Sequence, residues 1–542
     1  MLFYQSLLLL CSWVSEGCLN QQIPLGFDSH SVYHPSTAFE EKVNWSLEQF
    51  KVPGLAISFI NGSRVFTKGY GVADLTTSQP VSEHTLFFGG STTKAFTAAL
   101  ISILVDDNEN FPDIQWDATV HSIIPDDFTL SDPWFTTQVT VEDMLSHRSG
   151  MPRHDWVWFA NMTLQEAVRK MRYLPLTSTI RTKFNYCNLM YMAAAHLIET
   201  KTGKPFKDVL RERILEPLGM TETYVSLPDA QASGGEIARG YFLNSTRQLQ
   251  DTDLSFHESI RGAGNIITSA ADYAKWVQAM IQRSPPISPA GYAAIMGGHT
   301  IVSPEPMAPD TSPTLYGFGW FLRTYAGEVI IQHPGGIEGF GSLVCFLPRK
   351  KVGFVILGNN MIGTNAAVTL LGNHLIDDIL GTQEQDRPNW RKRAEATLEN
   401  TKISPRVLDD LYPRIPSPPL PPPLKLSEYE GTYSHPAYPT LKITTDCPSH
   451  SLFPRLSGKQ KLGPHRLCAK PSQSAFGSEA LVLELRHVTG DFWVVGTLMY
   501  GATSATRGKF ILSPEGTINQ ISIEMEPTMA LEHKGIHWTK TP

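Results

Sequence analysis

The spacing of apolar and polar residues changes character along this chain. Near the N-terminus, residues 55–60 and 65–70 have the composition of strands, and they flank Asn61-Gly62, a pair that favours a two-residue hairpin turn. Thr37 and Glu40, spaced as a capping box, predict that an amphipathic helix precedes this hairpin. The N-terminal part is therefore expected to supply one helix followed by two paired strands.

From about residue 91 to 285 the pattern becomes mainly helical. Segments 95–105, 189–198 and 270–281 are apolar-rich and have helical length. Strand character returns in three later segments: residues 329–332, 342–346 and 352–357. The coarse order is therefore sheet, helical insert, sheet.

Seven prolines between residues 413 and 423 mark the sharpest boundary in composition. Such a run favours an extended, semi-rigid polyproline spacer between two folding units. Beyond it, segments 481–485 and 492–495 and the alternating Ile521, Ile523 and Met525 indicate short strands, as in a small antiparallel barrel. We expect a first unit over residues 18–400, a linker over 401–425 and a second unit over 426–542.

Composition narrows the class of protein. The 542 residues are enough for two to four domains, and with 42% hydrophobic and 18% charged residues most of the chain is expected to fold. The net charge of −7 and the lack of a basic stripe argue against nucleic acid as a partner. No run approaches the roughly 18 apolar residues of a membrane span.

The N-terminus carries a targeting pattern. An apolar stretch over residues 7–14 is followed by Ser15 and Gly17, placed like positions −3 and −1 of a signal-peptidase site. This predicts a signal peptide over residues 1–17 and secretion. Because no Lys or Arg precedes Lys42, a buried N-terminal segment of an intracellular protein is the alternative. Four glycosylation sequons agree with secretion, at Asn44, Asn61, Asn161 and Asn244.

Cysteine usage and motif searches limit the chemistry. The six cysteines are too sparse for a disulfide scaffold and contain no CxxC pair, although Cys447 and Cys468 could pair in an oxidising compartment. The chain has no HExxH, P-loop, dinucleotide fingerprint or G-x-S-x-G elbow. We therefore expect neither a metal nor an organic cofactor.

The sequence Ser91-Thr92-Thr93-Lys94 opens the helical segment 95–105. A spacing of three places Ser91 and Lys94 on one helix face, where a neutral lysine amine could take the serine proton. The helix N-terminus would favour the developing alkoxide. The same four-residue pattern also occurs at the starts of capped surface helices, so it does not by itself indicate a catalytic serine.

Two further motifs have suitable chemistry. Tyr186 and Asn188 stand just before the helical segment 189–198, where a hydroxyl and an amide could reach one pocket. His333-Pro334-Gly335-Gly336 follows the strand segment 329–332 and could offer backbone N–H groups to a substrate. A core aromatic at a helix start and a packing histidine are the competing interpretations.

The order and spacing of the three motifs resemble the serine β-lactamase and penicillin-binding-protein superfamily, over about residues 37–375. Six further stretches support the resemblance: residues 69–74, 145–150, 216–220, 262–265, 316–320 and 357–359. The chain is similar to the branch of class C β-lactamases, D-aminopeptidases and esterases. The resemblance implies an α/β (α+β) fold, with an antiparallel sheet flanked by helices and interrupted by a helical insert. The tail resembles a lipocalin-like β-barrel domain.

Two other stretches match the letters of the superfamily's third motif. Lys201-Thr202-Gly203 lies at the end of a helical segment, where Gly is an ordinary C-cap. His533-Lys534-Gly535 lies beyond the proline run, outside the unit that would form the catalytic sheet. The aromatic cluster at residues 154–159 could line an acyl pocket, but an aromatic cluster beside a turn is more often core, and we interpret it so.

The resemblance implies roles for the motif residues. Ser91 would attack a carbonyl, and Lys94 and Tyr186 would share the proton transfers. Asn188 would bind the substrate or Lys94, and the N–H groups of Ser91 and Gly336 would hold the oxyanion. His333 either orients the substrate or packs.

Three functions follow, each with a small-molecule or peptide substrate. The first is a serine hydrolase that forms an acyl-enzyme with an ester or a (D-amino-acid) peptide or amide. The alternative is an acyltransferase or thioesterase/cyclase of small-molecule biosynthesis with the same residues. A non-catalytic binding protein fits the intact Ser91, Lys94 and Tyr186 set least well. Since Pro334 replaces the hydroxyl with which relatives hold a substrate carboxylate, penicillin is not the expected substrate.

Overall fold

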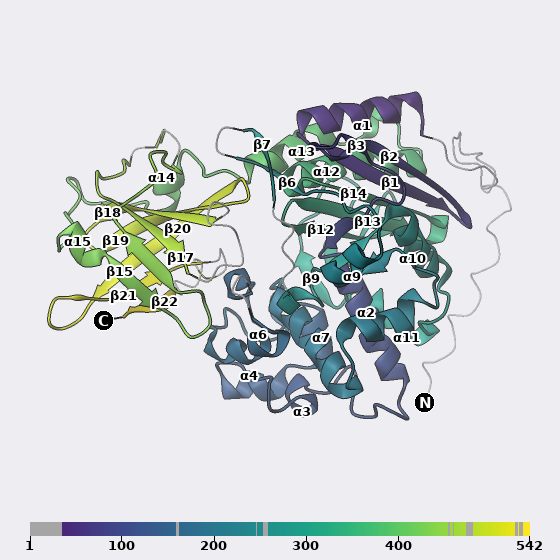
Figure 1. The fold of residues 1–542 in the computed structure, drawn as a ribbon, viewed down its shortest axis with the longest axis horizontal. Helices are drawn as coiled ribbons and strands as arrows, with labels where there is room; N and C mark the ends of the chain where they lie inside the picture. Colours follow the sequence, from purple (N-terminus) through teal and green to yellow (C-terminus); the bar gives the residue numbers. More distant parts are fainter. Residues whose placement is uncertain are drawn as a thin grey trace, which may run out of the picture.

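The computed structural model describes residues 35–158, 162–244, 247–252, 258–453, 456–458, 460–472, 481–525, 529 and 535–541 (Figure 1). The predicted signal peptide, the sequon asparagine Asn161 and the His533-Lys534 pair lie outside these residues. Within the described part of the chain, no helix is both long and apolar enough to cross a membrane.

The first unit is built on a nine-stranded sheet whose paired strands are all antiparallel. Its order is β3 (Gln79–Pro80), β2 (Arg64–Asp74), β1 (Gly54–Asn61), β14 (Val352–Gly358), β13 (Phe340–Leu347), β12 (Glu328–Ile337), β11 (Phe321–Tyr325), β10 (Thr314–Tyr316), β9 (Thr300–Ser303). Strand β1 pairs with β14, so the two ends of the unit meet in the middle of the sheet. The predicted order of sheet, insert, sheet is confirmed.

Helices cover both faces of this sheet. On one face lie α1 (Thr37–Gln49), α12 (Met361–Leu380) and α13 (Trp390–Glu399), and on the other lies α10 (Ala270–Gln282) with the helical insert (Figure 1). Every residue of β13 and β14 is buried, as expected for strands covered on both sides. This confirms the α/β (α+β) architecture.

The insert centres on two helices, α2 (Thr93–Asp106) and α7 (Asn188–Thr202). Both are apolar around most of their circumference, which is typical of helices that other elements surround. The remaining helices of this region are α3 (Val120–Ile123), α4 (Pro133–Gln138), α5 (Val141–Leu145), α6 (Leu164–Lys170), α8 (Phe206–Leu210), α9 (Leu227–Ala232) and α11 (Pro289–Ile295). The short strands are β4 (Phe87–Gly90), β5 (Thr223–Tyr224), β6 (Tyr241–Leu243), β7 (Leu249–Asp251) and β8 (Ile266–Thr268).

Two local predictions were wrong by one residue. The N-cap of α1 is Ser36 rather than Thr37, because the Ser36 side chain accepts from the Phe39 N–H and Glu40 pairs with Lys68 on β2 instead of reaching back. The hairpin turn is Gly62-Ser63 rather than Asn61-Gly62, since Asn61 still pairs with Arg64.

The second unit is a closed antiparallel barrel, which confirms the predicted fold. Its strands are β15 (Gly431–Ser434), β16 (Leu441–Thr444), β17 (Arg466–Pro471), β18 (Leu481–Thr489), β19 (Phe492–Met499), β20 (Ala502–Leu512), β21 (Ile518–Ile523) and β22 (Ile536–Lys540). The short helix α15 (Leu426–Tyr429) precedes them. Cys447 and Cys468 form a disulfide, as the sequence allowed.

The segment between the two units is not a bare spacer. It contains α14 (Val407–Leu411), and Val407 and Tyr412 pack with Phe453 and Val494 of the barrel. The Tyr412 hydroxyl donates to the backbone oxygen of Trp493 over 2.7 Å. These apolar side chains gain free energy by leaving water, so the first half of the linker is bound to the barrel rather than extended.

Candidate active site

Ser91 stands between the buried strand β4 and the start of α2. Strand β4 is tied to the main sheet by the Ser342 hydroxyl, which donates to the Gly89 oxygen over 2.7 Å. Gly90 has φ 55°, and a Cβ there would lie 2.6 Å from the backbone nitrogen of Gly336. Only glycine fits this conformation and this close approach, which brings the backbone before Ser91 beside that of β12.

Lys94 points from α2 toward Ser91 and is fully buried. Its Nζ lies 3.2 Å from Ser91 Oγ, 2.7 Å from Asn188 Oδ1 and 2.8 Å from the Ala263 oxygen. Burial, and next the positive charge of Arg153, hold the pKa of this amine well below 10.5. A neutral amine has two hydrogens, which serve the two carbonyl oxygens, so its lone pair is left facing the Ser91 hydroxyl.

Asn188 is the first residue of α7, and its amide orientation is determined by Asp155. Its Nδ2 donates to Asp155 Oδ1 over 2.8 Å, and a carboxylate can only accept. The other end of the amide, Oδ1, must therefore face Lys94. Asp155 is itself fixed by Arg153 at 2.6 Å and by the Trp158 indole N–H at 3.2 Å.

Tyr186 lies on the other side of the nucleophile. Its hydroxyl hydrogen-bonds the Ser91 side chain, and burial raises its pKa above the ordinary 10.0. Lys94 Nζ lies 4.8 Å from the centre of the ring and the Arg153 guanidinium carbon 4.9 Å from it. The phenol therefore stays neutral at physiological pH and can donate a proton at the reacting centre.

The buried His147 contacts Tyr186 and the residue that follows it. Its ring lies 4.4 Å from that of Tyr186, and its Nδ1 accepts from the Cys187 N–H over 3.1 Å. Burial, followed by the charge of Lys94, holds the pKa of His147 well below 6.5, so the neutral ring can act as an acceptor. It holds the backbone between Tyr186 and Asn188.

His333 on β12 is buried, with 1% of its surface exposed. Its Nδ1 lies 2.6 Å from the Pro334 oxygen and must donate to it, so Nε2 accepts from the Tyr316 hydroxyl over 3.0 Å. Burial lowers its pKa to about 3. Because both ring nitrogens are used inside the protein, this geometry favours the packing interpretation. Gly336, three residues on, is exposed and borders Gly90.

The structure thus brings Ser91, Lys94, Tyr186 and Asn188 together. The Lys201-Thr202-Gly203 stretch lies elsewhere: Gly203 is the left-handed C-cap of α7, and Lys201 pairs with Asp113. Among the glycosylation candidates, Asn44 on α1 is exposed, while Asn61 and Asn244 are half-buried.

Sequence reasoning missed Arg153, Asp155 and His147. Asp155 lies inside the cluster at residues 154–159 that was interpreted as core, and Arg153 directly precedes that cluster. The core interpretation is correct for Trp156 and Val157. The available signal was the charged pair that flanks His154, directly after the Gly150 turn. Charged residues in an otherwise apolar segment need partners, and here the partners are Tyr186 and Asn188.

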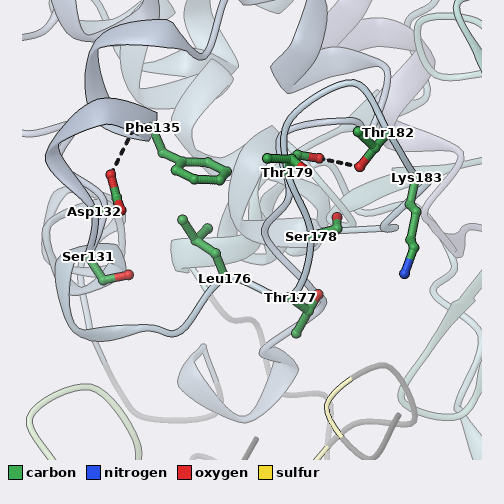
Figure 2. A pocket seen from close by; sticks show the side chains of 9 residues that line it. All are labelled: Ser131, Asp132, Phe135, Leu176, Thr177, Ser178, Thr179, Thr182 and Lys183. Carbon is green, nitrogen blue, oxygen red and sulfur yellow. Dashed lines mark hydrogen bonds between the residues drawn. The ribbon is translucent and has the colours of Figure 1, made fainter. Parts of the chain in front are cut away.

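The helical insert also contains a pocket of about 630 Å³ (Figure 2). It is lined by Ser131, Asp132, Phe135, Leu176, Thr177, Ser178, Thr179, Thr182 and Lys183. Phe135 and Leu176 point toward each other across it. We assign the chemistry to the Ser91 cluster, because Lys94 Nζ lies 3.2 Å from Ser91 Oγ there. One lining residue, Ser178, accepts from Asn185, the residue before Tyr186, over 2.8 Å.

Comparison with known proteins agrees with this geometry. The Beta-lactamase family model matches residues 39–374, and a domain of unknown function, DUF3471, matches residues 416–537. An unguisins hydrolase of Aspergillus campestris is 38% identical over 502 residues, covering 91% of this chain and 90% of the relative. A second unguisins hydrolase, from Aspergillus violaceofuscus, is 36% identical and covers 92% and 89%.

Solved structures share the fold. The octameric penicillin-binding protein homologue from Pyrococcus abyssi has a TM-score of 0.57 at 21% identity, covering 93% of this chain and 99% of that one. A D-amino acid amidase from Ochrobactrum anthropi has a TM-score of 0.52 at 24% identity, covering 64% and 98%. The chain belongs to the β-lactamase family. With hydrolases as relatives along nearly its whole length, it is a β-lactamase-like serine hydrolase.

Proposed function

We propose that this hydrolase works through an acyl-enzyme formed on Ser91 and acts on an ester or on a peptide or amide, D-amino-acid substrates included. The observation that carries the proposal is the hydrogen bonding of Lys94. Its Nζ lies near two carbonyl oxygens and Ser91 Oγ, the last at 3.2 Å. In the neutral amine the two hydrogens would serve the two carbonyl oxygens, and the lone pair would face Ser91 Oγ. A serine and a neutral base in this relation form an activated nucleophile.

Acylation then follows from the positions of the groups. Ser91 Oγ attacks the substrate carbonyl carbon, and its proton passes to Lys94 Nζ. The carbonyl oxygen becomes an oxyanion, which the N–H groups of Ser91 and Gly336 would hold, each contributing on the order of 3 kcal/mol. As the bond to the leaving group breaks, Tyr186 donates its phenol proton to that group and is reprotonated from Lys94.

Deacylation reverses these roles. Lys94 is neutral again and takes a proton from water, while the water oxygen attacks the acyl carbon. Ser91 leaves as the alcohol when it receives the proton, and the acid product departs. An amine or alcohol in place of water would turn the same site into an acyltransferase.

The substrate class rests on the third motif and on the relatives. Pro334 offers no hydroxyl for a substrate carboxylate, and both nitrogens of His333 are used internally. Neither residue provides the carboxylate contact of a penicillin-hydrolysing site. The unguisins hydrolases, similar over nine-tenths of the chain, support a hydrolytic role.

The test is a comparison of wild type, Ser91→Ala and Ser131→Ala on three substrates: an activated ester, a D-amino-acid anilide and a chromogenic cephalosporin. We expect turnover of the ester or anilide by wild type and by Ser131→Ala, whose serine lines the neighbouring pocket. Ser91→Ala should be inactive. Turnover retained in Ser91→Ala would refute the proposal, and transfer to an added amine that outcompetes water would establish the acyltransferase instead.

Secretion is a separate proposal, supported by the apolar N-terminal stretch with small residues at 15 and 17. N-terminal analysis of the native protein should find a chain that begins at Cys18. A native chain that retains Met1 would overturn it.

A further inference from the structure

We infer that the C-terminal barrel positions the catalytic groups: Tyr438 of the barrel holds His154, whose two sequence neighbours contact Tyr186 and Asn188. The inference rests on the proposed function of the Ser91 site. It gives the barrel a part in the reaction and makes Tyr438 and His154 positioning residues.

The contact between the two units is a buried hydrogen bond. His154 Nδ1 and the Tyr438 hydroxyl oxygen are 2.6 Å apart, and His154 Nε2 lies 3.0 Å from the Pro175 oxygen. A backbone oxygen only accepts, so Nε2 carries the ring proton. Burial lowers the pKa of His154 to about 4, so the ring is neutral and Nδ1 is an acceptor. The Tyr438 hydroxyl must therefore be the donor.

The barrel presents this tyrosine on a braced loop. His435 Nδ1 accepts from the N–H groups of Ala437 and Tyr438, each over 3.0 Å. The Tyr438 ring packs edge-on against Trp538 of β22 with centroids 5.3 Å apart, and the Trp538 indole N–H donates to the Pro439 oxygen. The hydroxyl of Tyr438 is therefore held in place by the barrel itself.

On the catalytic side, three consecutive residues contact three different parts of the molecule. Arg153 lies over the Tyr186 ring, His154 meets Tyr438, and Asp155 accepts from Asn188. His154 has φ 48° and ψ 37°, a left-handed conformation that a residue with a side chain adopts only when its surroundings hold it. Because Tyr438 supplies a buried partner at the centre of this turn, it helps to keep the neighbours in their catalytic contacts.

Loss of the hydroxyl would leave Nδ1 of His154 buried without its partner, which disfavours the observed turn. Asp155 would then hold Asn188 less well, and the amide that accepts from Lys94 would lose its fixed orientation. The consequence is slower acylation rather than weaker substrate binding, because the affected groups act on the proton of Ser91.

The experiment compares Tyr438→Phe with Tyr433→Phe in the full chain. Tyr433 is also fully buried in the barrel, but its hydroxyl donates to the Tyr429 oxygen within the barrel. We expect kcat/KM for an activated ester to fall about tenfold in Tyr438→Phe, mainly through a lower kcat. A tenfold loss is about the size of effect expected when one buried acceptor loses its hydrogen-bond partner. Tyr433→Phe should keep the wild-type kcat/KM although it loses a similar amount of thermal stability.

The pH profile distinguishes positioning from general destabilisation. Lys94 faces these titratable or charged groups: Arg153, Asp155, Cys187, Tyr186, Tyr191, His147 and His333. Of the charged neighbours, Arg153 has the largest effect and lowers the pKa of Lys94, so displacement of Arg153 should move the acidic limb of kcat/KM to higher pH in Tyr438→Phe alone.

A third variant, His154→Asn, tests the acceptor. Asn tolerates the left-handed conformation and places an amide oxygen where Nδ1 stands, so it should retain more activity than His154→Ala. If wild type acylates and Tyr438→Phe matches it in kcat/KM and pH profile, the inference is overturned. If wild type itself forms no acyl-enzyme, the proposed function fails instead, so the two failures are distinguishable.

Discussion

Asn188 donates its side-chain amide to Asp155 over 2.8 Å, and this hydrogen bond determines which end of the amide faces Lys94. The oxygen of Asn188 then takes one hydrogen of the lysine amine at 2.7 Å. Asp155 therefore acts on the nucleophile through two intermediaries. The Asp155 side chain is only 18% exposed, and its carboxylate forms an ion pair with Arg153, whose Nε lies 2.6 Å from Oδ2.

Asp155→Asn tests this chain of contacts. An amide at position 155 can donate N–H groups to Asn188, so hydrogen bonding no longer forces the Asn188 side chain to direct its oxygen at Lys94. We expect kcat/KM to fall between about 10-fold and 100-fold, which corresponds to about 1–3 kcal/mol for a disrupted buried hydrogen bond. Asp229→Asn removes an exposed partner of Lys207 and should change nothing. Equal kcat/KM in the two variants would contradict the role of Asp155.

Lys94→Arg replaces an amine that can be neutral with a group that stays charged, and so removes the base. Only the neutral amine can accept the Ser91 proton, so wild-type kcat/KM should rise as pH rises through the Lys94 pKa, which lies well below 10.5. Arginine stays protonated at every accessible pH, and we expect a loss of about 10²–10⁴ in kcat. Lys201→Arg, in the stretch that imitates the third motif, should retain full activity. A rising limb that persists in Lys94→Arg would show that another group is the base.

Gly90→Ala and Gly203→Ala separate catalytic geometry from backbone strain. Both glycines have positive φ, 55° and 66°, so both variants should lose about 1 kcal/mol of stability from backbone strain, and Gly90→Ala should lose more. Only at position 90 would the new Cβ meet the Gly336 nitrogen, at 2.6 Å, whereas nothing lies within 4 Å at position 203. We expect the acylation burst to disappear in Gly90→Ala and to persist in Gly203→Ala, measured by stopped-flow with an activated ester. An unchanged burst in Gly90→Ala would contradict the placement of the oxyanion site.

His154 also makes stability depend on pH. Its pKa is about 4 in the folded chain against 6.5 ordinarily, so on acidification the unfolded chain takes the proton first. The free energy of unfolding therefore falls between pH 6.5 and pH 4, by up to about 3 kcal/mol from this residue. His147, His333 and His435 add to the total, but the difference between wild type and His154→Asn isolates one group. Urea titrations at pH 7 and pH 4 should show a smaller loss in the variant, and equal losses would contradict the assignment.

Much of the fold could be predicted because its signals are local. The apolar segments 95–105, 189–198 and 270–281 became α2, α7 and α10, and all three predicted strands of the returning sheet are present. The errors were equally local: a serine one position earlier capped α1, and the hairpin turn moved by one residue. Competing caps and turns differ by fractions of a kcal/mol, which sequence patterns do not resolve.

The site was predictable only in part, for a different reason. Ser91 and Lys94 are three residues apart, and their relation follows from helix geometry. Asp155 and Asn188 are 33 residues apart, and His154 and Tyr438 are 284 apart, so their contacts exist only after the insert and the barrel have packed. Each of these residues has an ordinary surface or core explanation when it is considered alone. The chemistry they share comes from tertiary structure.

The most direct measurement is the mass of the intact protein during turnover of an activated ester, followed by peptide mapping of the adduct. Wild type should gain the mass of one acyl group, located on the peptide that contains Ser91, and Ser91→Ala should gain none. The adduct should disappear at the rate of the steady-state reaction. An acyl group mapped to another residue, or turnover without any adduct on Ser91 under rapid quench, would contradict the assignment of Ser91 as the nucleophile.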